Sequence, residues 1–157
     1  MRGKGIVTLV ALLLALPAAL QCADNLVLNP NLDYSDHNKK QGPLITGDNM
    51  DDGLVEGVPN YILFYGEKCY NSKRQARLTV HMYEKYKDRV HFVIVDLDKI
   101  GSYQHKYLAN HYFVGDIPHT TLLDKQGRVV FDYTGDTVES IVDGWIAYTL
   151  RKDSGQS

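Results

Sequence analysis

Cys69 is the residue whose type and position most clearly offer chemistry in this chain. It follows the apolar run 61–65 across a short turn, and it opens a long stretch of helical periodicity. A thiol at the start of a helix lies near free backbone N–H groups and the positive end of the helix dipole, and both favour the thiolate. Ser72 stands where a second cysteine would complete a redox pair. The motif Cys-Tyr-Asn-Ser is therefore a candidate active site with a single thiol.

Two kinds of neighbouring group can support a thiolate at Cys69. The hydroxyl of Ser72 lies about one helical turn away and can donate a hydrogen bond to the sulfur. Lys68 and Lys73 are cations close to Cys69 in the sequence, and an opposite charge favours the charged form of a thiol. Because no thiol lies beside Cys69, a mixed disulfide formed there has to be released by a thiol of another molecule. This restricts the chemistry to isomerisation, reversible thiolation or capture.

The elements that must position Cys69 alternate between strand and helix. Continuous apolar runs predict strands buried on both faces, and apolar residues spaced by three and four predict helices. The expected order is a strand at 61–65, a helix at 70–87, a strand at 90–95, a helix at 102–112, a hairpin of strands at 119–123 and 128–133, and a last helix opened by 135–137. A parallel crossover followed by an antiparallel edge predicts an α/β fold, with a central mixed β-sheet flanked by helices.

Three segments, in this order and spacing, resemble the thioredoxin family, and the resemblance spans about residues 50–150. Residues 64–73 are similar to the family's strand, turn, Cys-x-x-Cys and lysine. Residues 95–98 end a strand as the family's second marker does, and residues 115–120 are similar to its Gly-Ile-Pro-Thr element. The resemblance implies a thioredoxin-like fold.

The resemblance also implies roles for individual residues. Cys69 would be the nucleophile, and Pro118 would be a cis-proline that faces it. The backbone of Ile117 would pair with an extended substrate segment, with His119 beside it in the same substrate-binding set.

The chain departs from the family's pattern at four positions. Ser72 replaces the resolving cysteine, and Leu63 stands where many thioredoxins keep a buried acid that helps to deprotonate that cysteine. Losing both together is coherent, since an acid without its thiol would be an unpaired buried charge. Lys68 replaces the usual tryptophan before the nucleophile, and His119 replaces the threonine after the proline. Both of these changes add polar or cationic groups near the sulfur.

The N-terminus predicts a secretory signal peptide at 1–23. Arg2 and Lys4 precede an apolar run of about a dozen residues and a small-residue exit, whereas a membrane span needs about 20 apolar residues. Cleavage falls after Cys22 or Ala23, unless Cys22 is the lipidated first residue of a lipoprotein or the run stays as an uncleaved anchor. The outcome decides whether Cys69 is the only thiol of the mature chain.

The rest of the chain has the size of one globular domain. We expect a loop-rich lead-in at 24–47 with a short edge strand near 43–46, then a thioredoxin-like domain at 48–151 that opens with a brief helix, and a flexible tail at 152–157. Of 17 basic residues in the whole chain, two precede the cleavage point, which leaves 15 against 19 acidic ones and a net charge of about −4. Nucleic-acid binding is therefore not expected, because it needs a basic surface.

Two functional hypotheses of different classes follow. The first is monothiol thiol–disulfide exchange through Cys69, acting on cysteine-containing exported proteins or small thiols. The second is a non-enzymatic module that binds a partner protein through the groove between Cys69 and Pro118. The absence of an ER-retrieval signal favours a bacterial periplasm over an extracellular or lipid-anchored location. We expect a monomer with no cofactor, no metal, since the histidines show no ligand spacing, and no membrane contact beyond a lipid at Cys22.

Overall fold

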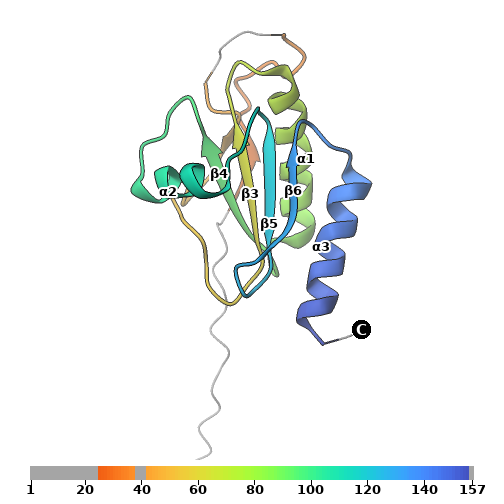
Figure 1. The fold of residues 1–157 in the computed structure, drawn as a ribbon. Coiled ribbons are helices and arrows are strands. Elements are labelled where there is room, and N and C mark those ends of the chain that lie inside the picture. Colours follow the sequence, from red (N-terminus) through yellow and green to blue (C-terminus); the bar gives the residue numbers. More distant parts are fainter. Residues whose placement is uncertain (1–24, 38–41, 156–157) are drawn as a thin grey trace, which may run out of the picture.

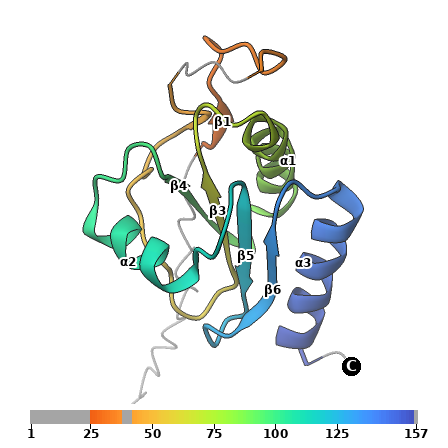
Figure 2. The ribbon, with the colours of Figure 1, turned by 45° about the horizontal axis from the view of Figure 1, so that its top comes forward.

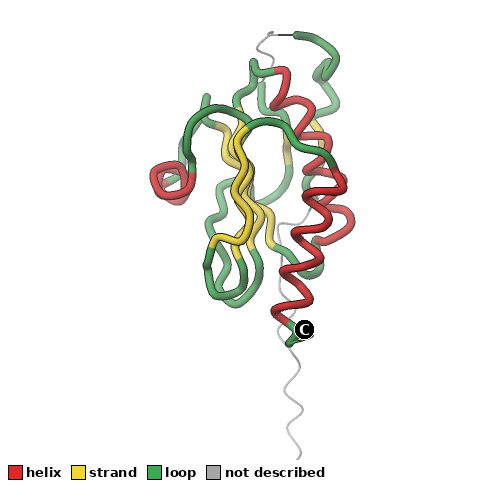
Figure 3. The backbone as a smooth tube through the Cα atoms, turned by 45° about the vertical axis from the view of Figure 1, so that its right-hand side comes forward, coloured by secondary structure: helices red, strands yellow, loops and turns green. Residues whose placement is uncertain are grey.

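The computed structural model describes residues 25–37 and 42–155, so the predicted signal peptide and Cys22 lie outside the described residues. The strands and helices are β1 (Val27–Leu28), β2 (Ile45–Thr46), β3 (Asn60–Tyr65), α1 (Tyr70–Tyr86), β4 (His91–Asp96), α2 (Tyr103–Tyr112), β5 (His119–Leu123), β6 (Val129–Thr134) and α3 (Glu139–Asp153). The main sheet has the order β4-β3-β5-β6, with β3 and β4 parallel and the other neighbours antiparallel. Helices α1 and α3 cover one face of this sheet and α2 covers the other (Figure 1, Figure 3). The α/β class with a mixed central sheet is confirmed.

The core consists of two apolar clusters that follow from the alternation of side chains along β3. Leu63 and Tyr65 point into the cluster that α1 and α3 cover, and Ile62 and Phe64 point into the cluster beneath Leu108 of α2. All four of these β3 side chains are fully buried. A strand buried on both faces needs a continuous apolar run, which is the pattern that predicted it.

The predicted helices at 70–87 and 102–112 are confirmed to within a residue. Ser102 is the N-cap of α2, and its hydroxyl accepts a hydrogen bond from the backbone N–H of His105 at 3.0 Å. Within the part of the chain that the structure describes, no helix is both long enough and apolar enough to cross a membrane.

Helix α3 begins at Glu139, later than the predicted start at 135–137. The backbone N–H of Gly135 donates to the carbonyl of Pro118 at 2.8 Å, and that of Thr137 donates to Oε1 of Gln75 at 3.0 Å. These hydrogen bonds attach residues 135–137 to the loop before β5 and to α1, so the segment precedes the helix and is not part of it.

The lead-in packs against the main domain as a small sheet of its own. The expected strand near 43–46 is confirmed as β2, and it pairs antiparallel with β1, which was not predicted. The backbone N–H of Leu44 donates to the hydroxyl of Tyr65 at 3.1 Å. Because Leu26, Leu44 and Ile45 are fully buried in the cluster beneath α1, the lead-in belongs to the same packed unit.

The prediction of a brief helix at the start of the domain is wrong. Residues 48–51 form a turn, in which Asn49 has a φ of +55°. Asparagine tolerates this left-handed backbone conformation better than most residues, and a right-handed helix cannot continue through it.

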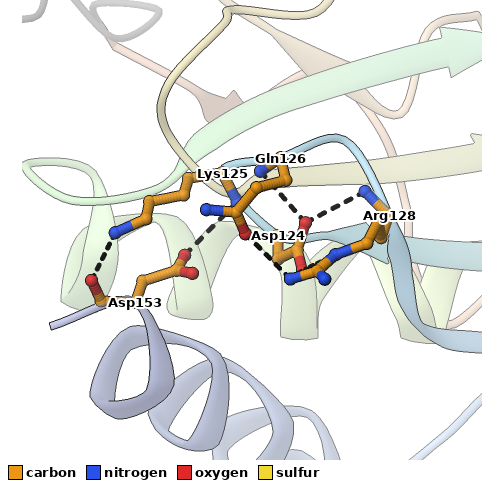
Figure 4. Close-up of polar contacts among 5 residues, drawn as sticks. All are labelled: Asp124, Lys125, Gln126, Arg128 and Asp153. Carbon is orange, nitrogen blue, oxygen red and sulfur yellow. Dashed lines mark hydrogen bonds and ion pairs between the residues drawn. The ribbon is translucent and has the colours of Figure 1, made fainter. Parts of the chain in front are cut away.

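The hairpin between β5 and β6 is closed by a network around the buried Asp124 (Figure 4). The backbone N–H groups of Gln126 and Arg128 donate to Oδ1 of Asp124 at 3.0 Å each, and Nε of Arg128 donates to Oδ2 at 2.8 Å. Burial opposes the charge on Asp124, but these hydrogen bonds outweigh it and lower the pKa of the carboxyl below its ordinary value. The Nζ of Lys125 donates to the carbonyl of Asp153, which ties the turn to the end of α3.

Substitutions of Leu63 test whether the core tolerates an acid at this position, where the resemblance places a buried acid in many thioredoxins. Leu63 is fully buried, with Ile94 and Thr120 as its partners in the sheet register. We expect Leu63→Ala to lower the free energy of unfolding by about 2–5 kcal/mol. We expect Leu63→Asp to lower it further, because its carboxylate would be buried within an apolar cluster. Urea denaturation measures both, with Val114→Ala at a 65% exposed position as a control of roughly 0.5 kcal/mol or less. A Leu63→Asp variant more stable than Leu63→Ala would contradict the prediction.

Candidate active site

Cys69 lies at the edge of the sheet where β3 ends and β5 begins. Phe64 stands opposite His119 in the antiparallel register, so the turn after β3 and the loop before β5 meet at one edge (Figure 2). Cys69 is the N-cap of α1. Its N–H donates to the carbonyl of Gly66 at 3.1 Å, and its own carbonyl accepts from the N–H of Lys73 at 3.1 Å. The half-buried thiol is therefore at the N-terminal end of a 17-residue helix, whose dipole favours negative charge.

The second wall of the site is the loop that carries Ile117 and Pro118. The peptide bond between them is cis, and the Sγ of Cys69 donates to the carbonyl of Ile117 at 3.6 Å. A Cβ at position 66 would lie 2.4 Å from Cδ1 of Ile117, so the glycine at 66 lets this side chain pack against the turn. Sequence motifs from distant parts of the chain, 48 residues apart, thus meet at the sulfur.

Ser72 is fully buried one turn into α1. Its Oγ accepts a hydrogen bond from the backbone N–H of Gly66 at 3.3 Å, so the hydroxyl holds the turn that precedes Cys69. In the described part of the chain, no hydrogen bond joins Ser72 to Cys69, and donation to a thiolate stays a prediction.

The two lysines predicted to stabilise a thiolate lie in different surroundings. Lys68 is exposed, whereas Lys73 is fully buried and donates from Nζ to the carbonyls of Asp36 at 2.8 Å and Asp33 at 3.4 Å. The ammonium of Lys73 thus anchors the lead-in loop on the first turn of α1. The effect of either lysine on the thiol stays a prediction.

The lead-in loop also reaches the residue after the thiol. The rings of His37 and Tyr70 are stacked, with centroids 3.9 Å apart and planes 23° from parallel. Together with the contacts of Lys73, this stack places the lead-in beside Cys69, which nothing in the sequence indicated.

His119 is buried between β5 and β6. Its Nδ1 lies 2.8 Å from Oγ1 of Thr134, and its Nε2 lies 2.9 Å from Oδ1 of Asp132. The ring also contacts the rings of Phe64 and Phe113, with centroids 5.8 Å away in each case. The imidazole therefore lies on the side of the sheet that α2 covers, and a role in substrate binding stays a prediction.

An acidic cluster that the sequence did not predict lies behind the turn of Cys69. Glu67 is fully buried and forms an ion pair with Nζ of Lys99 at 2.8 Å, and its backbone N–H donates to Oδ2 of Asp98 at 2.9 Å. Asp96 accepts on Oδ1 from the N–H of Asp98 at 3.0 Å, while its Oδ2 is buried without a hydrogen-bond partner among the described residues. Burial, followed by the neighbouring carboxylates, raises the pKa of Asp96 to about 6, although the N–H of Asp98 opposes the shift.

The signal for this cluster was present in the strand order. Parallel strands end at the same edge of a sheet, and Asp96 is paired with Tyr65 in the register of β3 and β4. Any acid that ends β4 must therefore lie close to the turn that follows β3. The resemblance of residues 95–98 to the family's marker does not by itself place them beside Glu67.

Comparisons with known proteins show what the chain is similar to in sequence and in fold. No protein-family model matches the chain. The chain is similar to the thioredoxin-like protein HCF164 of Oryza sativa subsp. japonica, with 31% identity over 78 residues that make up 50% of this chain and 29% of that protein. It is also similar to thylakoid membrane protein slr1796 of Synechocystis sp., with 26% identity over 98 residues, or 60% of this chain and 48% of that protein. The chain spans less than half the length of these relatives.

Two solved structures share the fold. Thioredoxin-2, described as a component of the malaria parasite's protein secretion machinery, aligns with a TM-score of 0.52 at 18% identity and covers 60% of this chain and 86% of its own. A structure described as that of a malarial protein aligns with a TM-score of 0.50 at 20% identity, covering 59% of this chain and 98% of its own.

The chain has the thioredoxin fold, since these neighbours and the mixed four-stranded sheet flanked by helices agree. The sequence likeness to HCF164 supports a thioredoxin-like protein.

The raised pKa of Asp96 predicts that the free energy of unfolding depends on pH. Its pKa is raised from an ordinary 3.8 to about 6, so between these values the folded state holds a proton that the unfolded state releases. The contribution of the protonated Asp96 to the free energy of unfolding is fully present below the ordinary pKa of 3.8 and is lost as the pH rises through about 6. We expect the stability of Asp96→Asn relative to the native chain to increase by about 1 kcal/mol from pH 4 to pH 7, after an allowance for partial solvent exposure.

Urea denaturation at several pH values measures this difference. The exposed Asp116→Asn serves as the control and is expected to show little change relative to the native chain over the same range. A constant difference between Asp96→Asn and the native chain would show that Asp96 is ionised throughout.

Proposed function

We propose that this chain carries out monothiol thiol–disulfide exchange through Cys69, by isomerisation or by formation of mixed disulfides. The observation that carries the proposal is the position of the thiol. Its Sγ is half-buried at the N-terminus of α1 and 3.6 Å from the carbonyl of Ile117, with Ser72 in place of a second cysteine. The partners that fit this chemistry are cysteine-containing exported proteins or small thiols.

The exchange begins when the Cys69 thiolate attacks one sulfur of a partner disulfide. A new S–S bond forms to Cys69 as the partner's S–S bond breaks, and the leaving sulfur departs as a thiolate that takes up a proton from water. A second thiolate, from the partner or from a small thiol, then attacks the mixed disulfide and releases Cys69 as a thiolate. No net oxidation of this chain results, because the Ser72 hydroxyl cannot form a disulfide.

A non-enzymatic module that binds a partner beside Cys69 and Pro118 is the second candidate. The contacts of Lys73 favour this candidate. Its ammonium, which was predicted to stabilise a thiolate at Cys69, instead donates to the carbonyls of Asp33 and Asp36. In that case the thiol would be dispensable for binding, which separates the two candidates experimentally.

Trapping of mixed disulfides tests the exchange. We expect acid-quenched extracts of the exporting cell to contain disulfide adducts of the native chain, seen on non-reducing gels, and Cys69→Ser to contain none. Adducts that persist in Cys69→Ser would contradict the proposal. Absence of adducts, together with equal recovery of a partner by the native chain and Cys69→Ser, would support the binding module instead.

Ser72→Cys is the matched variant of the same experiment. It places a thiol one helical turn from Cys69, so the mixed disulfide can be resolved internally. We expect the level of trapped adducts to fall roughly tenfold while an internal disulfide appears in the free chain. Unchanged adducts in Ser72→Cys would show that their release is not limited by the missing thiol.

Export, with a bacterial periplasm as its destination, is the second part of the proposal. Its support is the N-terminal pattern of residues 1–23 together with relatives described as chloroplastic and as a thylakoid membrane protein. We expect mass spectrometry of the chain from an exporting host to find a mature N-terminus at Ala23 or Asp24, or a lipidated Cys22. A secreted form that keeps residues 1–21 would rule out the signal peptide.

A further inference from the structure

Two buried histidines contact the β2–β3 connection, residues 47–59. Nε2 of His91, the first residue of β4, lies 3.0 Å from the carbonyl oxygen of Gly53. A carbonyl only accepts hydrogen bonds, so this ring nitrogen carries the proton and is the donor. His105, in the first turn of α2, interacts with the backbone of Asp52. One imidazole from the sheet and one from a helix therefore hold adjacent residues of the β2–β3 connection.

Each of these imidazoles has one ring nitrogen that is buried without a partner. His91 and His105 are 1% and 5% exposed. Neither Nδ1 of His91 nor Nε2 of His105 has a hydrogen-bond partner among the described residues. A neutral imidazole tolerates this arrangement, because its second nitrogen carries a lone pair and no proton. A protonated imidazole has two N–H donors, so the charge and the second N–H would be buried without an acceptor.

The surroundings of His91 keep it neutral. The carboxylate that acts on its ring is that of Asp52, and β3 places the uncharged Asn60 opposite it in the sheet register. Burial lowers the pKa of His91 below its ordinary 6.5, although the carbonyl of Gly53 and the charge of Asp52 oppose the shift.

The ring of His105 lines a cavity of about 300 Å³ between the β2–β3 connection, the edge strand β4 and α2. Asp51 faces this cavity from the connection, and Asp96 and Lys99 face it from the end of β4 and the turn that follows. Burial lowers the pKa of His105 as well, although the charges of Asp51 and Asp52 and the backbone of Asp52 oppose the shift. Both histidines therefore favour the neutral form as long as the connection stays in place.

The β2–β3 connection itself is loosely packed. Besides the 300 Å³ cavity, it borders a cavity of about 400 Å³ at the turn between β5 and β6 and one of about 180 Å³ at α2. A Cβ at Gly53 would lie 3.0 Å from Cγ of Gln104, so the connection packs closely on α2 there. Near its end, Nδ2 of Asn60 donates to the carbonyl of Val55 at 2.9 Å. A segment with cavities on several sides opens at a lower free energy than the core.

We propose that His91 and His105 form a pH-sensitive clamp on residues 51–58, which is closed while both imidazoles are neutral and opens when they are protonated. A proton from water adds to the second nitrogen of each ring, and the charged rings reach water only when the connection moves away. Because the two pKa values are lowered in the closed fold, the clamp is stable above about pH 6.5 and weakens as the pH falls below it. Opening uncovers the edge of β4. The clamp uses no residue of the Cys69 site and does not rest on thiol exchange.

Hydrogen–deuterium exchange of the full chain, read by mass spectrometry and corrected for the intrinsic effect of pH, tests the clamp. Suitable reporters are the N–H groups of Asp52 and Val55, which donate to the carbonyl of Asn49 at 3.1 Å and to Oδ1 of Asn60 at 2.9 Å. We expect residues 51–58 to lose protection roughly tenfold or more between about pH 7.5 and about pH 5, while β3 keeps its protection. Unchanged protection of residues 51–58 would overturn the proposal, and so would an equal loss in β3, which would indicate global unfolding.

The double variant His91→Gln with His105→Gln separates the histidines from other titrating groups. A glutamine amide can donate to the carbonyl of Gly53 but takes up no proton in this range. We expect the double variant to keep residues 51–58 protected at about pH 5, and each single variant to show an intermediate loss. His81→Gln is the matched control at an exposed histidine, and it should open like the native chain.

A loss of protection at acid pH that persists in the double variant would overturn the proposal. Asp96 cannot produce this loss, because its raised pKa stabilises the fold as the pH falls. If the double variant does not fold, NMR titration of the native chain decides. The proposal requires that the imidazoles of His91 and His105 titrate below 6.5 and that the amide shifts of residues 51–58 follow the same midpoints. Amide shifts that do not follow these midpoints would contradict it.

Discussion

The antiparallel register between β3 and β5 is the constraint on which the rest of the site depends. It sets Phe64 opposite His119, so the end of one central strand and the start of the other reach the same edge of the sheet. The thiol of Cys69 and the carbonyl of Ile117 come within 3.6 Å only because both strands stop there. The buried side chains of β3 hold this register, since a slip by one residue would exchange the two apolar clusters between the faces.

The carboxylates near the thiol lie where the central strands end, whereas the position of Leu63 within β3 is apolar. Leu63 and Ile94 are paired in the parallel register and fill the interior with apolar atoms. The acids of the site are Glu67 and Asp96, which lie where β3 and β4 end. The half-exposed Lys99 forms an ion pair with Glu67 there. An apolar side chain at position 63 is easier to pack than an acid, because a buried charge needs a partner and hydrogen bonds to offset its desolvation.

Local patterns predicted what local physics determines. The strand of β3, the helix α1 and the cap at Ser102 each follow from a continuous apolar run, a helical period or a side chain that accepts from the backbone. The contact of Lys73 with the carbonyl of Asp36 joins residues 37 apart and leaves no periodic trace in the sequence. For α3, periodicity indicates apolar residues but does not tell that Val142 and Ile146 are buried while Ile141 stays exposed, because only packing against the sheet and α1 decides that.

The lead-in bears on how a partner can approach Cys69. Its loop is held on the first turn of α1 by the His37–Tyr70 stack and by Lys73, so that side of the thiol is already in contact with the chain itself. The half-buried Ile117, whose carbonyl accepts from the thiol, lies on the loop before β5. A disulfide must present one sulfur in line with the attacking thiolate, and we infer that it does so along the Ile117 side. The proposed exchange depends on an outside thiol for its completion, so it needs this side open twice, first for the partner disulfide and then for the thiol that releases it.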